Sequence, residues 1–351
     1  MRSNIKIEKL FNWEHWPSYM FYIPNIPFAF YHAIKAGSLV FYTATNPGIE
    51  NSGIGTESKF KTLQLLPEKY LPKTIFHKAN SNIELTLKEV NQSQITYPLI
   101  AKPDVGFRGL LVKKIENENT LISYLKKFPI DVLVQEFLTQ ENECGIFYHR
   151  IPNEKKGKIT SITLKEFLHV IGDGKSTIEE LIKNDKRAKI YIELFKEGCC
   201  NINLEQIIPK GEKIKLSSIG NHSKGTRFIN GNHLISKKLE ETFNNLNNQT
   251  NDWYYGRLDL KYNSFNDVEK GDFKILELNG ILAEPTHIYD SQNINYPKAL
   301  KEIRKHWKQI NKIARFNHDQ NKVPYRTTLG LLKDVKKLIN YTKLISKLNK
   351  S

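Results

Sequence analysis

The sequence has few cysteines and no long apolar run, and both absences narrow the kind of protein it encodes. Its three cysteines are Cys144 and the adjacent pair Cys199 and Cys200. They give no disulfide framework and lack the paired Cys-x-x-Cys spacing of a zinc site, so we expect free thiols. The most apolar stretch, Phe21 to Tyr42, is interrupted by two prolines, a histidine and a lysine. No window offers the roughly 18 uninterrupted apolar residues of a membrane span.

A signal peptide is also missing from the sequence pattern. Lys6, Glu8 and Lys9 occupy the positions where an apolar stretch would begin. We therefore expect a cytoplasmic protein without a transmembrane segment. A hydrophobic fraction of 39% with 26% charged residues is typical of a folded chain, and 351 residues suit two or three lobes.

Acidic residues are too few to balance the basic ones, since 53 Lys and Arg face 37 Asp and Glu, which gives a formal net charge of +16. This charge attracts anions but does not say whether they are nucleotides, acidic substrates, lipid headgroups or nucleic acid. Much of the excess lies between Lys298 and Lys350, where we expect a basic helical tail. The tail would either pack on the body by its apolar stripe or contact an anionic membrane or an acidic partner. The stripe follows helical spacing through Leu331, Leu332, Val335, Leu338, Ile339 and Leu344.

The order of predicted elements indicates the fold class. Runs of strands with helices between them, including hairpin-like returns, predict an α+β fold of two lobes instead of a doubly wound parallel sheet. We expect strands at about 97–102, 110–115, 132–137, 143–150, 159–170, 253–262 and 273–278, and helices at about 57–66, 119–127, 177–183 and 236–246. The expected divisions are a small N-terminal lobe (1–57), two subdomains (58–135 and 136–300) and the basic tail (301–351).

The strongest chemical signal is a pair of strands, Tyr255-Gly-Arg-Leu-Asp-Leu260 and Lys274-Ile-Leu-Glu-Leu-Asn279, which we expect to be joined by a polar turn. Side chains two apart on a strand share a face, so four polar groups would converge if the strands pair as a hairpin. Burying two carboxylates on otherwise apolar strands is costly unless an ion compensates them. Two carboxylates and an amide oxygen are hard ligands suited to magnesium. The alternative is a half-exposed hairpin whose polar face meets water.

Two weaker signals precede this pair of strands. Lys102 ends a predicted strand before a loop in which Gly106 and Gly109 let backbone N–H groups approach a phosphate. The apolar strand beginning at Val132 leads into a hinge followed by Glu143, an arrangement that can offer backbone groups to an adenine and a carboxylate to ribose hydroxyls. Read separately, the first is a common hairpin turn and the second a core strand with a solvated acidic loop.

One motif is a decoy. Gly172-Asp-Gly-Lys-Ser-Thr177 resembles the end of a phosphate-binding P-loop, but the first glycine of that pattern would fall at His169. Ser176 with Glu179, and Thr177 with Glu180, have the spacing of a helix capping box. We interpret the segment as a turn and a cap.

Taken in order, these pieces resemble the ATP-grasp superfamily, in members such as D-alanine–D-alanine ligase, glutathione synthetase and cyanophycin synthetase. The resemblance covers about 58–289 and is most specific at the Arg-x-Asp and Glu-x-Asn strands. It implies that Asp259, Glu277 and Asn279 hold magnesium ions (or manganese) and that Arg257 stabilises the acyl phosphate and the tetrahedral intermediate. It implies ATP contacts for Lys102, Gly106, Gly109, Lys165 and Lys59, and Lys61 is a rival to Lys59. It also implies that Glu136, Phe137 and Leu138 form the adenine hinge and that Glu143 is the ribose carboxylate. Softer matches are Phe167 to Ile182 and Asn221 to Gly225.

The activity implied by the resemblance is ATP-dependent joining of a carboxylate to an amine (or thiol) through an acyl phosphate, with ADP and phosphate as products. The N-terminal lobe is shorter than in dipeptide ligases and the basic tail has no counterpart, so the substrates stay open, as does a homodimer. Two alternatives are a non-catalytic nucleotide-binding scaffold and a nucleic-acid-binding protein. The second would need basic and aromatic residues interleaved on one surface, whereas the aromatics gather in the N-terminal lobe and the strands, so we expect no nucleic-acid partner.

Overall fold

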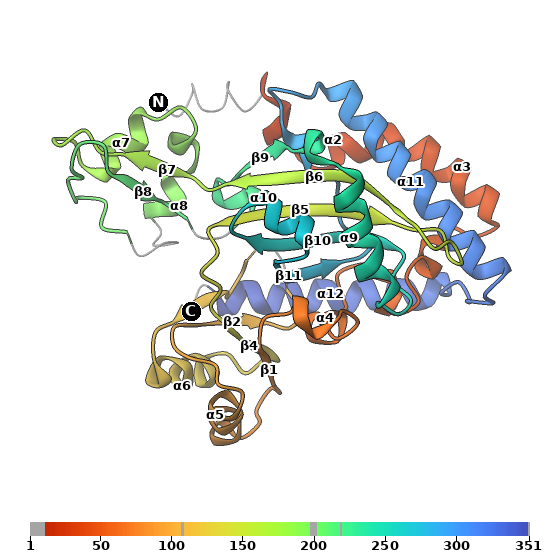
Figure 1. Cartoon of the computed structure of the whole chain (residues 1–351), viewed down its shortest axis with the longest axis horizontal. Helices are drawn as coiled ribbons and strands as arrows, with labels where there is room; N and C mark the ends of the chain where they lie inside the picture. Colours follow the sequence, from red (N-terminus) through yellow and green to blue (C-terminus); the bar gives the residue numbers. More distant parts are fainter. Residues whose placement is uncertain (1–10, 107–108, 197–201, 218–219, 350–351) are drawn as a thin grey trace.

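The computed structural model describes residues 11–106, 109–196, 202–217 and 220–349, and these residues form two larger antiparallel sheets with helices packed against them and a small two-stranded sheet (Figure 1). The α+β prediction is therefore confirmed. Cys144 is a buried free thiol, whereas Cys199 and Cys200 lie outside the described residues. Within the described residues no helix is both long enough and apolar enough to cross a membrane.

The first sheet has four strands in the order β1-β4-β2-β3. Its apolar residues form one core with helices α5 and α6, because the strands alternate buried and less buried positions. The bounds are β1 (Thr74–His77), β2 (Leu99–Pro103), β3 (Lys113–Ile115), β4 (Val132–Glu136), α5 (Ile83–Gln92) and α6 (Glu118–Lys127).

The second sheet has five strands in the order β11-β10-β5-β6-β9 and contributes most of the candidate site. Side chains on one face, including Tyr148 and Leu258, pack against α9, whereas Phe147 and Tyr255 on the other face pack against α11 and α3. The strands are β5 (Asn142–His149), β6 (Lys158–Glu166), β9 (Arg227–Asn230), β10 (Tyr255–Tyr262) and β11 (Lys274–Asn279), and the helices are α3 (Ile26–Ala36), α9 (Lys237–Asn248) and α11 (Tyr296–Asp319).

Between β6 and β9 the chain builds a small two-stranded sheet with its own core. The predicted continuous strand at 159–170 is wrong: β6 ends at Glu166, and β7 (His169–Ile171) pairs with β8 (Lys213–Lys215). The two strands separate because Leu168 is buried in this local core and not in the main sheet. The helices here are α7 (Ile178–Asn184) and α8 (Ile192–Lys196), and Thr177 caps α7 in a capping box with Glu180, as predicted.

The connection between β10 and β11 is a helix, α10 (Phe265–Lys270), so the predicted simple polar turn is wrong. Ser264 and Asp267 form a capping box at its start, and Gly271 ends it in the left-handed conformation (φ 81°). Both are local signals in the sequence. The strands on either side nevertheless pair as neighbours, which keeps the geometry that the sequence predicted for them.

The N-terminal segment is helical and lies beside α11 (Figure 1). Its elements are η1 (Trp13–His15), α2 (Tyr19–Tyr22), η2 (Ile23–Asn25) and α3, followed by η3 (Phe41–Ala44), η4 (Glu50–Ser52) and the short helix α4 (Lys59–Leu63). A further turn, η5 (Glu68–Tyr70), precedes β1. Buried Asn46 ties this region to the second sheet, since its amide donates to the carbonyl of Tyr255 at 2.8 Å.

The C-terminal region is helical, as predicted, and contains α11 and α12 (Thr328–Leu348). Only part of the predicted apolar stripe of α12 packs on the body: Leu331 is buried, whereas Leu332 and Ile339 are 60% and 50% exposed, and Ile345, which was not in the stripe, is buried. Ile345 joins the core of the first sheet. The helix meets the body along a narrow line, so much of the predicted stripe stays in contact with solvent.

Candidate active site

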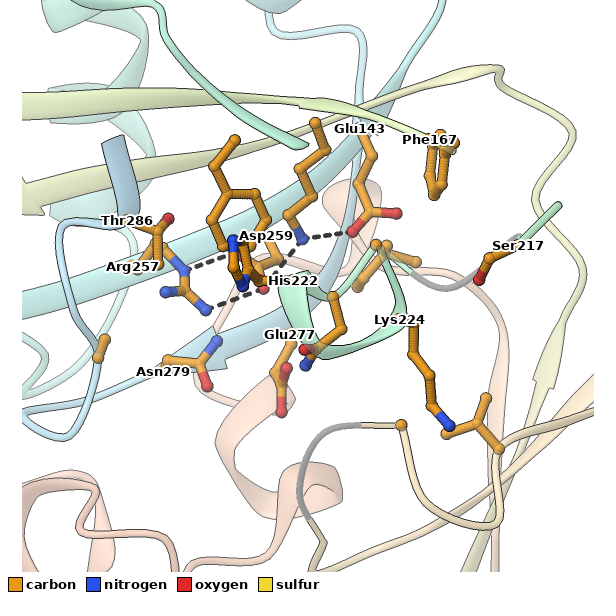
Figure 2. A pocket seen from close by; sticks show the side chains of 18 of the residues that line it. Glu143, Phe167, Ser217, His222, Lys224, Arg257, Asp259, Glu277, Asn279 and Thr286 are labelled. Atoms are coloured by element: carbon orange, nitrogen blue, oxygen red, sulfur yellow. Dashed lines mark hydrogen bonds and ion pairs between the residues drawn. The ribbon is translucent and has the colours of Figure 1, made fainter. Parts of the chain in front are cut away.

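The candidate site is built on one face of the second sheet, where β10 and β11 pair in antiparallel register. Arg257 lies opposite Asn279 and Asp259 lies opposite Glu277. Leu258, between the two polar residues of β10, is fully buried on the other face. The period of two residues therefore brings four polar side chains together on the face that Figure 2 shows.

Asp259 is almost buried and lies between two cations. Arg257 donates from Nε to Oδ1 at 2.7 Å and from Nη2 to Oδ2 at 3.2 Å, and Nζ of Lys165 lies 3.5 Å from Oδ2. Lys165 also donates to Glu143 at 2.5 Å, and both of these side chains are less than a tenth exposed (Figure 2). Burial alone would lower the pKa of Lys165, but Asp259 and Glu143 reverse the effect and raise it. Lys165 is therefore held as a cation.

Glu277 meets two lysines that come from outside the second sheet. Nζ of Lys59, the first residue of α4, lies 2.8 Å from its carboxylate. Burial raises the pKa of Glu277, but Lys59, Lys102 and Arg257 outweigh burial and lower it to about 2. The carboxylate is therefore ionised throughout the neutral range. Lys61, the rival to Lys59, is exposed on the outside of α4.

Lys102 reaches the site from β2 of the first sheet. Its Nζ donates to Oε1 of Gln135 at 3.0 Å and to the carbonyl of Leu276 at 3.2 Å. Burial lowers the pKa of Lys102 to about 8, and the attraction of Glu277 offsets only part of that effect. The two sheets thus contribute opposite sides of one charged cluster, with Lys59 also donating to the carbonyl of Gly106 at 3.0 Å.

The cluster fits a divalent cation by its chemistry. Asp259 and Glu277 supply carboxylates from directly paired positions, and Asn279 adds an amide whose nitrogen is buried without a hydrogen-bond partner. Oxygen ligands of this kind suit magnesium or manganese. In the structure these carboxylates form ion pairs with Arg257, Lys165 and Lys59. The protein therefore supplies the positive charges that balance the carboxylate side chains expected to bind the metal.

A cleft of about 2600 Å³ lies between the two sheets. Every residue of the predicted site lines it, including the cations, the carboxylates, the two glycines and the hinge. In the hinge, the carboxylate of Glu136 accepts from the backbone of Lys73 at 2.9 Å, and Phe137 is 38% exposed with Lys114 over its ring. Residues 107–108 of the glycine loop lie outside the described chain. The structure therefore gathers the whole predicted set around one space large enough for a nucleotide and a second substrate.

Glu143 is covered by the segment that follows 219. A side chain at Gly220 would begin 2.4 Å from its carboxylate, so a larger residue there would have to displace the Glu143 side chain. From this point the chain continues through η7 (His222–Lys224), which borders the same cleft (Figure 2). The turn from Asn221 to Gly225, a soft match in the sequence, thus lies at the site.

A second group of polar residues, in the part of the cleft that the N-terminal segment lines, was not predicted from the sequence. Buried Glu14 accepts hydrogen bonds from Arg187 and from His222, both at 2.8 Å. These partners lower the pKa of Glu14 to about 2 despite its burial, which acts in the opposite direction. Glu14, His15 and His222 lie close enough together to hold a metal ion, but Arg187 already pairs with the same carboxylate oxygen. Nothing in the sequence pattern connects residues so far apart.

A third carboxylate, Glu284, was also missed. It accepts hydrogen bonds from Tyr22 and Tyr289, and its backbone carbonyl accepts from Arg257 at 3.1 Å. It comes five residues after Asn279, so its nearness to the predicted ligands was the one signal that could have found it. The loop after β11 therefore links the N-terminal segment to the charged cluster.

No protein-family model matches the sequence, and no curated protein matches it either. Among solved structures, the chain is similar to the D-Ala:D-Ser ligase VanG from Enterococcus faecalis, at 14% identity and a TM-score of 0.41 over 76% of this chain and 63% of that one. A D-alanine–D-alanine ligase from Bacillus anthracis matches at 14% identity and a TM-score of 0.42, over 76% of this chain and 71% of that one.

A bifunctional glutathione synthetase from Pasteurella multocida matches at 15% identity and a TM-score of 0.40, over 73% of this chain and 37% of that one. The chain thus spans less than two thirds of the length of VanG and of the glutathione synthetase.

Proposed function

We propose that this protein is an ATP-dependent ligase of the ATP-grasp type, which activates a carboxylate as an acyl phosphate and transfers it to an amine or thiol. The observation that carries the proposal is the cluster of Asp259, Glu277 and Asn279 on paired strands, faced by Lys102 and Lys59 from the other side of the cleft. A cation-rich cleft lined by two carboxylates from paired strands suits a nucleoside triphosphate and a divalent ion.

The two subdomains, 58–135 and 136–300, are proposed to hold ATP between them. Lys102, Lys59 and Lys165 supply positive charge toward the phosphates, the hinge at 136–138 offers its backbone to the adenine, and Glu143 accepts from the ribose. Asp259, Glu277 and Asn279 would hold magnesium, or manganese, which when bound neutralises phosphate charge and orients the phosphates for in-line transfer. The described geometry supports these roles because all of these side chains border one cleft.

In the first step an oxygen of the substrate carboxylate attacks the γ-phosphorus of ATP and ADP leaves. In the second step the amine attacks the carbonyl carbon of the acyl phosphate, loses a proton, and expels inorganic phosphate. Arg257 stabilises the oxyanion that develops in the second step. Its guanidinium is already oriented by two hydrogen bonds to Asp259 and one to the carbonyl of Glu284, so it needs little reorganisation.

The test is a screen of amino acids, dipeptides and acidic metabolites for ADP and phosphate release in the presence of ATP and magnesium. We expect one class of carboxylate to stimulate release and Glu277→Ala to abolish it, because the change removes an ionised ligand from the cluster. Glu241→Ala on the exposed surface of α9 is the matched control and should keep full turnover. Nucleotide binding without carboxylate-dependent ADP release would favour a scaffold, and unchanged turnover in Glu277→Ala would contradict the metal assignment.

A further inference from the structure

An unusual apolar surface runs along the N-terminal helices, away from the cleft. Tyr19, Ile23, Ile26, Phe30 and Ile34 recur at helical spacing through α2, η2 and α3, and between 44% and 80% of each residue is exposed. We call these five residues the apolar ridge. From 16 to 34 the sequence contains no Asp, Glu, Lys or Arg, so no charge interrupts the ridge. Contiguous exposed apolar surface of this kind marks an interaction site.

The inner face of the same helices is fixed to α11. Phe21 and Asn25 are fully buried, Arg304 of α11 donates to Oδ1 of Asn25 at 2.7 Å, and Asn311 donates to the carbonyl of His32 at 3.0 Å. The ridge is therefore not the unpacked inner face of a loosely placed helix. It is the outer face of a segment whose other side is anchored by buried hydrogen bonds.

Helix α11, which packs against α3 and η2 (Figure 1), carries a stripe of cations. All five lysines of the stripe are exposed and follow spacings of three and four residues along the helix. The nearby acid Glu302 is half-buried and paired with Lys305 at 2.6 Å. We call this set the basic stripe, and it comprises Lys298, Lys301, Lys305, Lys308 and Lys312.

We propose that the apolar ridge and the basic stripe together form a docking surface for an anionic lipid bilayer. Aromatic and aliphatic side chains enter the boundary between headgroups and acyl chains, while adjacent lysines meet the anionic headgroups. The net charge of +16 acts in the same direction. This surface is separate from the cleft, so the inference does not rest on the proposed ligase activity.

Charge and shape favour a membrane over other occupants. A second copy of the chain would bring a second molecule of charge +16 to the same surface, which like-charge repulsion opposes. Nucleic acid would use the lysines but would find few hydrogen-bonding groups along the ridge, whose members are isoleucine, phenylalanine and tyrosine. A bilayer uses both the cations and the apolar side chains.

The experiment is co-sedimentation of the full chain with vesicles of phosphatidylcholine alone and of equimolar phosphatidylcholine and phosphatidylserine. We expect binding to the mixed vesicles only, with weaker binding at higher salt. The double variant Lys301→Gln with Lys308→Gln should bind roughly 25-fold more weakly, because each lysine near an anionic surface contributes roughly a factor of five. Phe30→Gln with Ile34→Gln should weaken binding at least roughly tenfold through lost apolar burial.

The matched control is Leu332→Gln with Ile339→Gln on α12, whose side chains are similarly exposed but lie outside the ridge. It should bind as the unaltered chain does. Circular dichroism checks the fold of each variant, and the lysine variant tests the proposal independently if the ridge variant is unstable. The proposal is overturned if the mixed vesicles leave the protein in solution, if only the α12 variant loses binding, or if light scattering shows a dimer that only the ridge variant disrupts.

Discussion

Two groups of charged residues in the cleft each hold a buried carboxylate against basic partners, but only one of them was predictable from the sequence. In one group Arg257, Asp259 and Glu277 lie on two strands that are neighbours in both sequence and space. In the other group Glu14 meets Arg187 and His222, which are 173 and 208 positions away along the chain. The first cluster follows from local alternation, and the second exists only because distant segments fold together.

This difference suggests different roles for the two groups. The strand cluster lies on a sheet held on both faces by helices, so its geometry is fixed by the main core. The Glu14 cluster instead links a 3-10 turn, η1, to the segment of chain between β6 and β9. Rigid positioning suits the common chemistry of phosphates, whereas the linked segments suit recognition of a particular substrate.

The largest expected effect is that of replacing Arg257, and it tests whether the cluster of Arg257, Asp259 and Glu277 on the paired strands performs the chemistry. Arg257→Lys should lower kcat for carboxylate-dependent ADP release by roughly 100- to 1000-fold, because a lysine cannot reproduce the two-point contact with Asp259 and the donor toward the oxyanion. The affinity for ATP should change little. Steady-state kinetics together with calorimetric titration of ATP separate the two quantities.

The same exchange at Arg227 is the control. Arg227 pairs with Glu166, which lines the cleft, and with Gln292, but Arg227 itself is not part of the lining, so Arg227→Lys should leave kcat unchanged within a factor of two. If the two variants lose activity equally, the special role of Arg257 is wrong and the strand cluster is only structural.

Much of the fold was predictable because its signals are local. The strands at 132–136 and 255–262 were found within about two residues of their ends, since apolar alternation and flanking turns mark them. Helix α3 was missed because its sequence is aromatic and proline-containing, without the polar face that helical periodicity needs. Its Pro27 in the first turn and Gly37 at the end were the available signals.

The candidate site divides in the same way. Spacing along β10 and β11 predicted which side chains share a face, and the register shows them opposite one another. The spacing could not show that Lys165 would be shared between Asp259 and Glu143, because that contact depends on how β6, β5 and β10 are ordered in the sheet. Sheet order is a global property, and no short motif encodes it.

Asn46 is expected to show the next largest effect and tests how the N-terminal region is attached. It is fully buried, donates to the carbonyls of Ser52 and Tyr255, and accepts from the backbone N–H groups of Tyr254 and Tyr255. Asn46→Ala leaves several buried polar groups unpaired, which should lower the free energy of unfolding by about 3 kcal/mol. Urea denaturation followed by tryptophan fluorescence measures the change.

Asn245→Ala provides the comparison, because Asn245 is exposed on α9 and alanine favours helix. Its stability should differ from the original by less than about 0.5 kcal/mol. A loss in Asn46→Ala no larger than this would mean that the N-terminal region is not coupled to the second sheet through Asn46, and the contrast between the two groups of charged residues would weaken.

The smallest expected effect concerns the pH dependence of nucleotide binding through Lys102. Burial lowers its pKa to about 8, below the value of 10.5 in an unfolded chain. The side chain is therefore charged below pH 8 and loses its charge as pH rises through that value. If it contacts ATP phosphates, affinity should be constant at lower pH and fall about tenfold per unit above pH 8 until the charge is lost.

Because proton binding and ATP binding are linked, a second and independent observation is expected, namely proton uptake on ATP binding. ATP stabilises the charged form of Lys102, so binding near pH 8 should take up protons, which calorimetry in buffers of different ionisation enthalpy detects. Lys102→Met should bind ATP about tenfold more weakly at pH 7 and show neither the decline nor the proton uptake. Lys61→Met, on the exposed face of α4, should retain both.

Stability changes in the opposite direction, because the unfolded chain binds more protons between pH 8 and 10.5 and the contribution of Lys102 to folding therefore improves as pH rises. A loss of affinity with no loss of stability would assign the effect to the charge itself and not to the fold.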